Sequence, residues 1–134
     1  MSNALEQTAE LVAWTIDDYE FDRKLNRRVL TRSGAFTHIF DFPSAQNALD
    51  VLREFKVFPQ IIFLDVMMPI KNGCDFLAEA TEEFGDHFSS RVEIMLTSSL
   101  NLDDRARAER YQAVQEFLSK TLTFDDVQTI AENT

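Results

Sequence analysis

The feature that most constrains the fold is a regular alternation between two kinds of segment. Five short stretches are apolar and rich in β-branched or aromatic residues, which is typical of strands. They lie at residues 11–16, 36–40, 61–64, 92–96 and 116–118. Apolar residues at helical spacing follow each of them, at residues 21–29, 45–55, 77–84, 102–110 and 124–132. Five repeats of strand and helix predict an α/β fold, a parallel sheet with right-handed crossovers and helices on both faces.

A doubly wound five-stranded sheet of this length commonly has the strand order 2-1-3-4-5. The continuously apolar stretch Ile61–Leu64 fits a central strand that is covered on both faces. In this order strands 1 and 3 are neighbours, and the crevice at their carboxyl ends is the expected place for functional residues. With 134 residues, we expect residues 1–134 to form a single domain, its core at about 11–132, with no output domain.

Two helix starts carry capping signals. Ser44 precedes the apolar pattern of residues 45–55 and is a predicted N-cap. Thr123 precedes the last helix, with Asp126 three residues later, which is close to a capping box.

Charge and cysteine content exclude several functions. Thirteen basic and 23 acidic residues give a net charge of −10, which disfavours independent binding to nucleic acid or to an anionic membrane. One cysteine, Cys74, cannot form an internal disulfide. We see no signal-peptide pattern and no apolar run that could span a bilayer, so we expect a cytoplasmic protein without membrane or nucleic-acid partners.

Carboxylates follow two strands that the predicted topology makes neighbours. Asp17 and Asp18 follow the first strand, and Asp65 follows the third. Three carboxylates in one crevice would repel one another, and a hard divalent cation such as Mg²⁺ removes that conflict. Acidic residues also suit the start of a helix, which would explain the Asp17–Asp18 pair but not Asp65.

The other two strand ends carry a hydroxyl and an ammonium group. Thr97 follows the fourth strand, and Lys120 follows the fifth. A Thr in a loop or a Lys after a strand is an ordinary surface feature when it occurs alone. At these strand ends, however, Thr97 could donate to a bound phosphoryl oxygen, and Lys120 could pair with Asp65 or with such an oxygen.

Residues 65–73 read Asp-Val-Met-Met-Pro-Ile-Lys-Asn-Gly. This stretch fits the pattern D-x-x-M-P-x-x-x-G of the receiver domain of two-component response regulators. Together with Asp17, Asp18, Thr97 and Lys120 at matching spacings, it makes the chain resemble that family over about residues 11–132. The resemblance implies a flavodoxin-like fold and a stand-alone receiver of the chemotaxis type.

The resemblance also implies a role for each site residue. Asp65 corresponds to the phosphoacceptor, which takes a phosphoryl group from a phosphohistidine. Mg²⁺ would be held by Asp17, Asp18, Asp65 and the backbone carbonyl of Met67. The remaining implied roles are a switch hydroxyl at Thr97, a phosphoryl-pairing ammonium at Lys120, and a switch aromatic at Phe117, which could equally be a plain strand residue.

Two positions depart from the family pattern. Thr121 stands where the family usually has a proline joined to the lysine by a cis bond, which puts the placement of Lys120 in question. Met67 and Ser99, two residues beyond Asp65 and Thr97, lack a group suited to orient an attacking water. We therefore expect a long-lived phosphoryl group.

By resemblance, the partners are a histidine kinase or a histidine phosphotransfer protein, docked on the first helix, and a downstream protein on the face of the fourth helix, fifth strand and fifth helix. The basic residues of the first helix could equally be a solvated face.

The protein is expected to be a signalling phosphoprotein rather than an enzyme. The main alternative is a phosphorylation-independent interaction domain. An aspartyl phosphatase would want a second Asp at position 67, and a flavin module would want a phosphate-binding loop in place of Asp17–Asp18.

Overall fold

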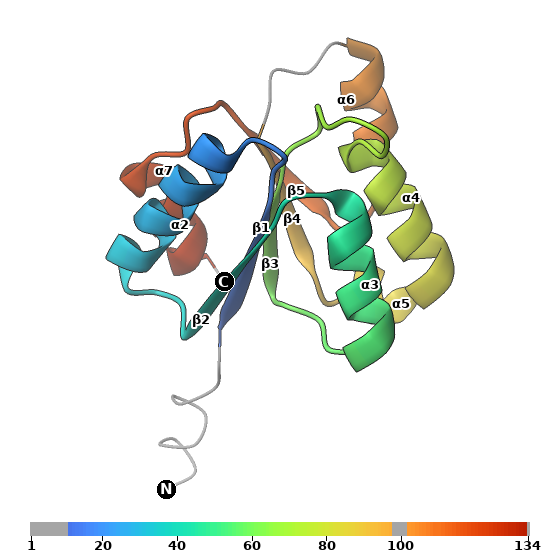
Figure 1. The fold of residues 1–134 in the computed structure, drawn as a ribbon, viewed down its shortest axis with the longest axis horizontal. Coiled ribbons are helices and arrows are strands. Elements are labelled where there is room, and N and C mark those ends of the chain that lie inside the picture. Colours follow the sequence, from blue (N-terminus) through green and yellow to red (C-terminus); the bar gives the residue numbers. More distant parts are fainter. Residues whose placement is uncertain (1–10, 98–101, 134) are drawn as a thin grey trace, which may run out of the picture.

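The computed structural model describes residues 11–97 and 102–133, the side chain of Leu102 excepted, and its centre is one parallel sheet (Figure 1). The strands are β1 (Val12–Ile16), β2 (His38–Phe42), β3 (Ile61–Leu64), β4 (Glu93–Thr97) and β5 (Val114–Leu118). Their order is β2-β1-β3-β4-β5, and every neighbouring pair is parallel. The predicted fold class and strand order are therefore confirmed.

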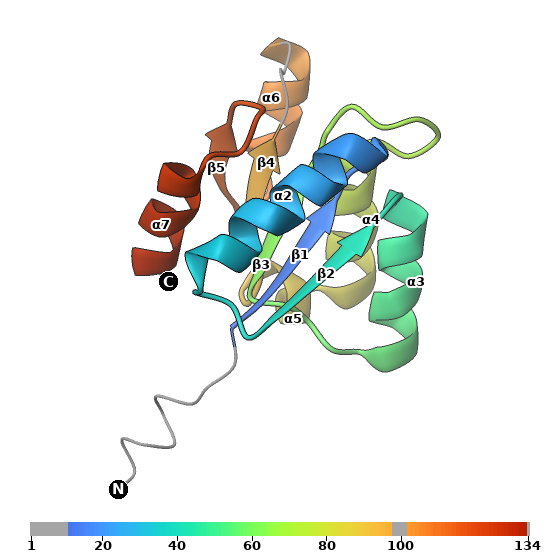
Figure 2. The same cartoon turned by 60° about the vertical axis from the view of Figure 1, so that its left-hand side comes forward.

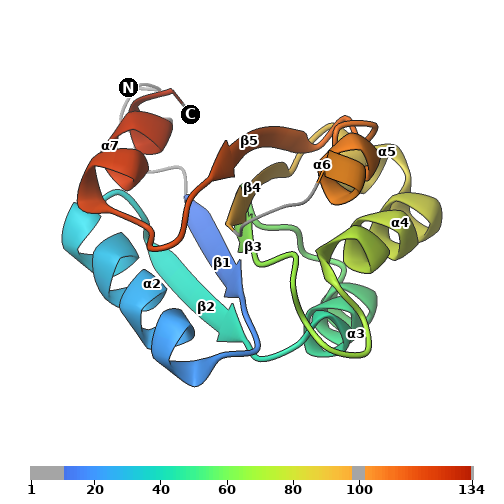
Figure 3. The same ribbon diagram turned by 90° about the horizontal axis from the view of Figure 1, so that it is seen from above.

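Helices cover both faces of the sheet. On one face lie α2 (Glu20–Ser33) and α7 (Phe124–Glu132), side by side in Figures 1 and 2. On the other face lie α3 (Ala45–Phe55), α4 (Gly73–Phe84), the one-turn helix α5 (Asp86–Ser89) and α6 (Leu102–Ala108). The view from above separates the two layers of helices clearly (Figure 3). This arrangement follows from right-handed crossovers between parallel strands.

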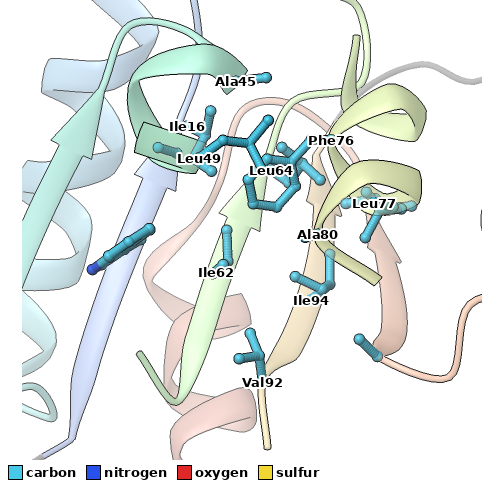
Figure 4. Close-up of a cluster of buried hydrophobic side chains, with 14 of the residues drawn as sticks. Ile16, Ala45, Leu49, Ile62, Leu64, Phe76, Leu77, Ala80, Val92 and Ile94 are labelled. Carbon is cyan, nitrogen blue, oxygen red and sulfur yellow. The ribbon is translucent and has the colours of Figure 1, made fainter. Parts of the chain in front are cut away.

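The core is divided between the two faces because successive strand residues point to opposite sides. On β1, Trp14 and Ile16 belong to the larger cluster beneath α3 and α4, whereas Ala13 belongs to the smaller cluster beneath α2 and α7. Figure 4 shows the larger cluster, in which Leu49 and Phe76 pack over the strands. All four residues of β3 are buried, as its continuous apolar sequence predicts.

The predicted capping residues do cap their helices. Ser44 Oγ accepts a hydrogen bond from the backbone N–H of Asn47 at 3.1 Å. Thr123 and Asp126 form a reciprocal capping box at the start of α7. A second capping box, which was not predicted, starts α4 with Asn72 and Asp75.

The strand limits differ from the predicted ones by one residue in β1 and β4 and by two residues in β2 and β5. The second strand runs from His38 to Phe42 rather than over residues 36–40, because the ladder pairs Val12 with His38 and Ile16 with Phe42. This register brings the rings of Trp14 and Phe42 to 4.5 Å between centroids. The fifth strand begins at Val114 rather than at residue 116, next to an irregularity in the ladder at Ile94 and Met95.

Two apolar residues within the predicted helical patterns, Phe21 and Ala106, are exposed. In the pattern at residues 21–29, Leu25 and Val29 are partly buried, and the buried residues of α2 are Asn26 and Leu30. Asn26 is satisfied there because its amide donates to Thr15 Oγ1 at 3.1 Å. In α6, Ala106 is exposed and Ala108 is buried, while the side chain of Leu102 lies outside the described residues. Helix α5 was not predicted.

Candidate functional site

Asp17 and Asp65 are side by side because their strands are neighbours. The Asp17 N–H donates to the carbonyl of Phe42, and the Asp65 N–H donates to the carbonyl of Ile16, so both residues extend the sheet ladder by one position. Both are buried, whereas Asp18 is exposed. Oxygens of Asp17, Asp18 and Asp65 lie within 4.8 Å of one another. The topology thus brings together the three carboxylates that the sequence singles out.

The two buried carboxylates are oriented in the same way. Asp17 Oδ1 accepts a hydrogen bond from the N–H of Tyr19 at 3.0 Å, and Asp65 Oδ1 accepts one from the N–H of Met67 at 3.2 Å. Each acid is therefore fixed by the amide two residues later in its own loop. This leaves the Oδ2 atom of each carboxylate for the crevice.

Lys120 points into the crevice between these acids. Its Nζ lies 2.9 Å from Asp17 Oδ2 and 3.3 Å from Asp65 Oδ2, so the expected contact with Asp65 is present. A third carboxylate, Asp22 of α2, accepts a hydrogen bond from the same ammonium at 3.0 Å. The peptide bond between Lys120 and Thr121 is cis.

The electrostatics of the site follow from this crowding. Burial, together with the negative charge of Asp17, raises the pKa of Asp65 to about 6, although Lys120 and the Met67 amide act in the opposite direction. Burial would lower the pKa of Lys120, but its contacts with Asp17, Asp22 and Asp65 outweigh that effect and raise it. Lys120 is therefore positively charged over the whole physiological range, and Asp65 is a more basic carboxylate than usual.

The donor set of the site fits a hard divalent cation. Asp17 Oδ2 is buried and accepts no hydrogen bond from the described residues; its contact with Lys120 is ionic, without hydrogen-bond geometry. A buried carboxylate oxygen that accepts no hydrogen bond, in a cluster of three acids, is the kind of ligand that Mg²⁺ takes. Thr97 Oγ1, buried at the end of β4, likewise has no partner among the described residues. Ser99 lies outside those residues.

Gly73 is required by the close packing of the loop that follows Asp65. Its N–H donates to the carbonyl of Val66 at 2.9 Å, which closes the loop onto the start of α4. A Cβ at this position would lie 2.9 Å from the carbonyl oxygen of Asp65 and 2.9 Å from Val66 Cα. The glycine of the nine-residue motif is therefore needed because the helix start touches the backbone of Asp65.

Phe117 lies on β5 and is only partly buried. The guanidinium carbon of Arg105, on α6, sits 4.3 Å from the centroid of the Phe117 ring, which is a cation–π contact.

Cys74 is buried at the start of α4, and its Sγ lies 3.8 Å from the carbonyl oxygen of Asp104, which fits a packing role. His38 and His87 are exposed on different elements.

Asp22 is a site residue that was not predicted from the sequence. The available signal was its place in the first turn of the helix that directly follows the Asp17–Asp18 pair, which keeps Asp22 near that pair. Acidic residues are common in the first turn of a helix because they interact favourably with the helix dipole. Asp22 therefore does not stand out as a site residue in the sequence.

Comparison with known proteins agrees with this fold and site. The sequence matches the response regulator receiver domain family over residues 14–132, and the chain therefore belongs to that family. It is 30% identical over 115 residues to the transcriptional regulatory protein MalR of Bacillus subtilis, covering 85% of this chain and 46% of MalR. It is 26% identical over 106 residues to the chemotaxis protein CheY of Halobacterium salinarum, covering 78% of this chain and 80% of CheY.

Solved structures show the same fold. A two-component response regulator from Cytophaga hutchinsonii superimposes with a TM-score of 0.80 at 25% identity, covering 93% of this chain and 98% of that one. The Mn²⁺-bound form of response regulator Rcp1 superimposes with a TM-score of 0.68 at 24% identity, covering 92% and 90%. The chain spans about half the length of MalR and of a probable C4-dicarboxylate response regulator of Halalkalibacterium halodurans. None of the described helices is long and apolar enough to cross a membrane.

Proposed function

We propose that this receiver domain accepts a phosphoryl group from a phosphohistidine onto Asp65 and thereby changes its protein contacts or passes the phosphoryl group on. The observation that carries the proposal is the position of Asp65 Oδ2, which lies 3.3 Å from Lys120 Nζ in a cluster of three acids, two of them buried. A carboxylate with a raised pKa and an ammonium beside it suits an oxygen nucleophile that must then support a more negative group.

The transfer step uses the residues of the crevice. An Asp65 carboxylate oxygen attacks the phosphorus of the donor, a P–O bond forms, and the P–N bond to the imidazole breaks. The phosphorylated imidazole carries a proton on its second ring nitrogen, so it leaves with the electron pair of the P–N bond as neutral histidine. Such a transfer asks the protein mainly to position groups and to balance charge on the phosphoryl oxygens. Lys120 is near enough to Asp65 to do so, and Thr97 offers a buried hydroxyl without another described partner.

Asp17, Asp18, Asp65 and the backbone carbonyl of Met67 are the residues proposed to hold Mg²⁺. When bound, the cation supplies charge neutralisation between the carboxylates and the phosphoryl oxygens. The buried Oδ2 of Asp17, which accepts no hydrogen bond from the described residues, supports this assignment. The existence of a Mn²⁺-bound form of response regulator Rcp1, which shares this fold, supports it as well.

Signal output is proposed to proceed through the face formed by α6, β5 and α7. The acyl phosphate adds negative charge at Asp65, which draws the hydroxyl of Thr97 toward it and alters the room available to Phe117. Arg105, on α6, packs on the ring of Phe117. A movement of Phe117 therefore changes a contact of α6. The proposed phosphodonor, a histidine kinase or a phosphotransfer protein, docks on α2, where Phe21 is exposed.

The test is the intact mass of the protein after incubation with Mg²⁺ and phosphoramidate, a small donor that contains a P–N bond. We expect one phosphoryl adduct on the wild type, and none on Asp65→Asn or after EDTA is added. Asp41→Asn, which removes an exposed acid that pairs with Arg27 on the edge strand β2, is the control and forms the adduct.

The opposite results are equally informative. An adduct that survives Asp65→Asn would place the acceptor elsewhere, and one that forms in EDTA would exclude the proposed metal role. The absence of an adduct with phosphoramidate, with acetyl phosphate and with a phosphorylated histidine kinase would contradict the proposal and favour a phosphorylation-independent interaction domain.

A further inference from the structure

Lys120 is shared by three carboxylates that play different parts in the site. Its Nζ is 2.9 Å from Asp17, 3.0 Å from Asp22 and 3.3 Å from Asp65. An ammonium has three N–H donors, so it can serve three such partners at once. The contact with Asp22 is a hydrogen bond at 3.0 Å, and Asp17 and Asp65 form ion pairs with the same ammonium.

Asp22 differs from the other two acids in position. It lies in the first turn of α2, whereas Asp17 and Asp65 follow β1 and β3. It is not one of the three acids whose oxygens lie within 4.8 Å of one another. Helix α2 packs beside α7, and the loop that carries Lys120 leads into α7 (Figures 1 and 2). The contact between Asp22 and Lys120 therefore ties the start of one helix to the loop before its neighbour.

This separation matters when a cation is present. Asp17 and Asp65 are proposed cation ligands, and a carboxylate that shares its charge with a divalent cation attracts the ammonium less strongly. Asp22 keeps its full charge because it stands outside the cluster. Among the three described acids that contact Lys120, Asp22 is then the one whose attraction for the ammonium is not reduced by the cation.

We propose that Asp22 is a positioning residue that holds Lys120 at the mouth of the crevice when a cation engages Asp17 and Asp65. This inference rests on the proposed phosphoryl transfer, because holding Lys120 there keeps its ammonium beside the atom that becomes phosphorylated. Nothing needs to move far for this, since Nζ is already 3.3 Å from Asp65 Oδ2. Asp22 thus acts on the reaction through Lys120, without contact with the phosphoryl group.

The first test measures how available the Lys120 amine is, independently of any phosphorylation. Wild type, Asp22→Asn, Asp22→Glu and Glu20→Gln are acetylated with limiting acetic anhydride, with and without Mg²⁺, and the modified lysines are quantified by mass spectrometry. Glu20→Gln is the matched control: it removes the same charge from the same helix turn, but Glu20 pairs with Lys24 at 2.9 Å. Circular dichroism verifies that every variant is folded.

In Mg²⁺ we expect acetylation of Lys120 to rise roughly two- to fivefold in Asp22→Asn and to return to the wild-type level in Asp22→Glu. The rise is smaller without Mg²⁺, since Asp17 and Asp65 then still hold the ammonium. Glu20→Gln raises the acetylation of Lys24 instead. An Asp22→Asn protein in which Lys120 is as protected as in the wild type in Mg²⁺ overturns the proposal.

The second test follows phosphoryl acceptance. In Mg²⁺, the rate of adduct formation with phosphoramidate falls roughly two- to fivefold in Asp22→Asn and recovers in Asp22→Glu, while Mg²⁺ affinity, measured by calorimetry, changes no more than in Glu20→Gln. A rate that rises in Asp22→Asn would identify Asp22 as a competitor for Lys120 and refute the positioning role. A wild type without any adduct refutes the proposed function, whereas the acetylation result still decides whether Asp22 holds Lys120.

Discussion

Asp17 and Asp65 are held in the same way: Oδ1 of each accepts a hydrogen bond from the N–H two residues later, and Oδ2 faces Lys120 Nζ, at 2.9 and 3.3 Å respectively. The two loops are independent in sequence but share this local geometry. It places two negative charges near one positive charge in a buried crevice, so the site carries unrelieved repulsion without a cation.

Replacing the central carboxylate by an amide relieves that repulsion. We expect Asp65→Asn to raise the free energy of unfolding at pH 7 by about 1–3 kcal/mol, because a buried charge whose pKa is raised destabilises the folded state once it ionises. Chemical denaturation without divalent cations measures this. Glu54→Gln, at an exposed position on α3, is the control for net charge. A lower stability of Asp65→Asn would refute the repulsion argument.

The pH dependence follows from the same group. The folded-state pKa of Asp65 is about 6, above the ordinary 3.8, so the folded state holds its proton more tightly than the unfolded state. Its favourable contribution is complete below about pH 3.8 and is lost as pH rises through about 6. The stability difference between Asp65→Asn and wild type should therefore widen from pH 4 to pH 7. A difference that is constant over this range would contradict the raised pKa.

Addition of Mg²⁺ should stabilise the wild type by mass action, since binding to the folded state alone contributes about 2.7 kcal/mol at a hundredfold excess over the dissociation constant. EDTA should lower the melting temperature to that of the metal-free protein without unfolding it, because the core does not depend on the site. Thermal melts with increasing Mg²⁺ test this. The shift should be strongly reduced in Asp17→Asn, and an undiminished shift in that variant would exclude Asp17 as a ligand.

The close approach of Gly73 to the Asp65 backbone gives a prediction for the loop. Gly73→Ala should cost about 1–3 kcal/mol of stability, because its Cβ would meet backbone atoms at 2.9 Å that cannot turn away. Gly34→Ala provides the comparison: it has a φ of +70° but nothing within 4 Å of an added Cβ, so its cost is conformational only. Denaturant midpoints measure both. If Gly73→Ala retained full stability, the loop would have to be looser than this contact implies.

The exposed side chain of Met67 bears on the lifetime of the phosphoryl group. A thioether cannot orient an attacking water, so we expect slow spontaneous dephosphorylation in the wild type and faster loss in Met67→Asn. The gain should stay below the roughly hundredfold that is typical of general base catalysis, because an amide orients a water without accepting its proton. The decay of the adduct mass after removal of the donor measures this. Met67→Leu is the control and decays as the wild type does. Rapid loss from the wild type that Met67→Asn leaves unaccelerated would contradict the interpretation.

Much of the fold can be predicted from the sequence because the signals are local. The apolar stretch Ile61–Leu64 is buried on both faces and can only be a central strand, and Ser44 and Thr123 mark their helix starts by hydrogen bonds that span three residues. The positions of Asp17 and Asp65 follow from the same logic, because strand order alone makes their strands neighbours.

The errors arise where packing overrides local pattern. Phe21 fits the apolar spacing of its helix but is exposed, because the rotation of α2 against the sheet buries Asn26 and Leu30 instead. The limits of β2 depend on its register with β1, and a strand's own sequence does not contain that register.

The sequence by itself determined the order of the elements, the caps, the acids at neighbouring strand ends and the motif from Asp65 to Gly73, because each depends on residues that are close in the chain or on strand order. Only the tertiary structure decided that Asp17 and Asp22, besides the expected Asp65, meet Lys120. Asp22 lies 98 positions away from it, and their contact depends on how α2 turns against the sheet and packs beside α7. Rotation of a helix by a fraction of a turn decides such a contact, and that rotation is fixed by the packing of the whole core.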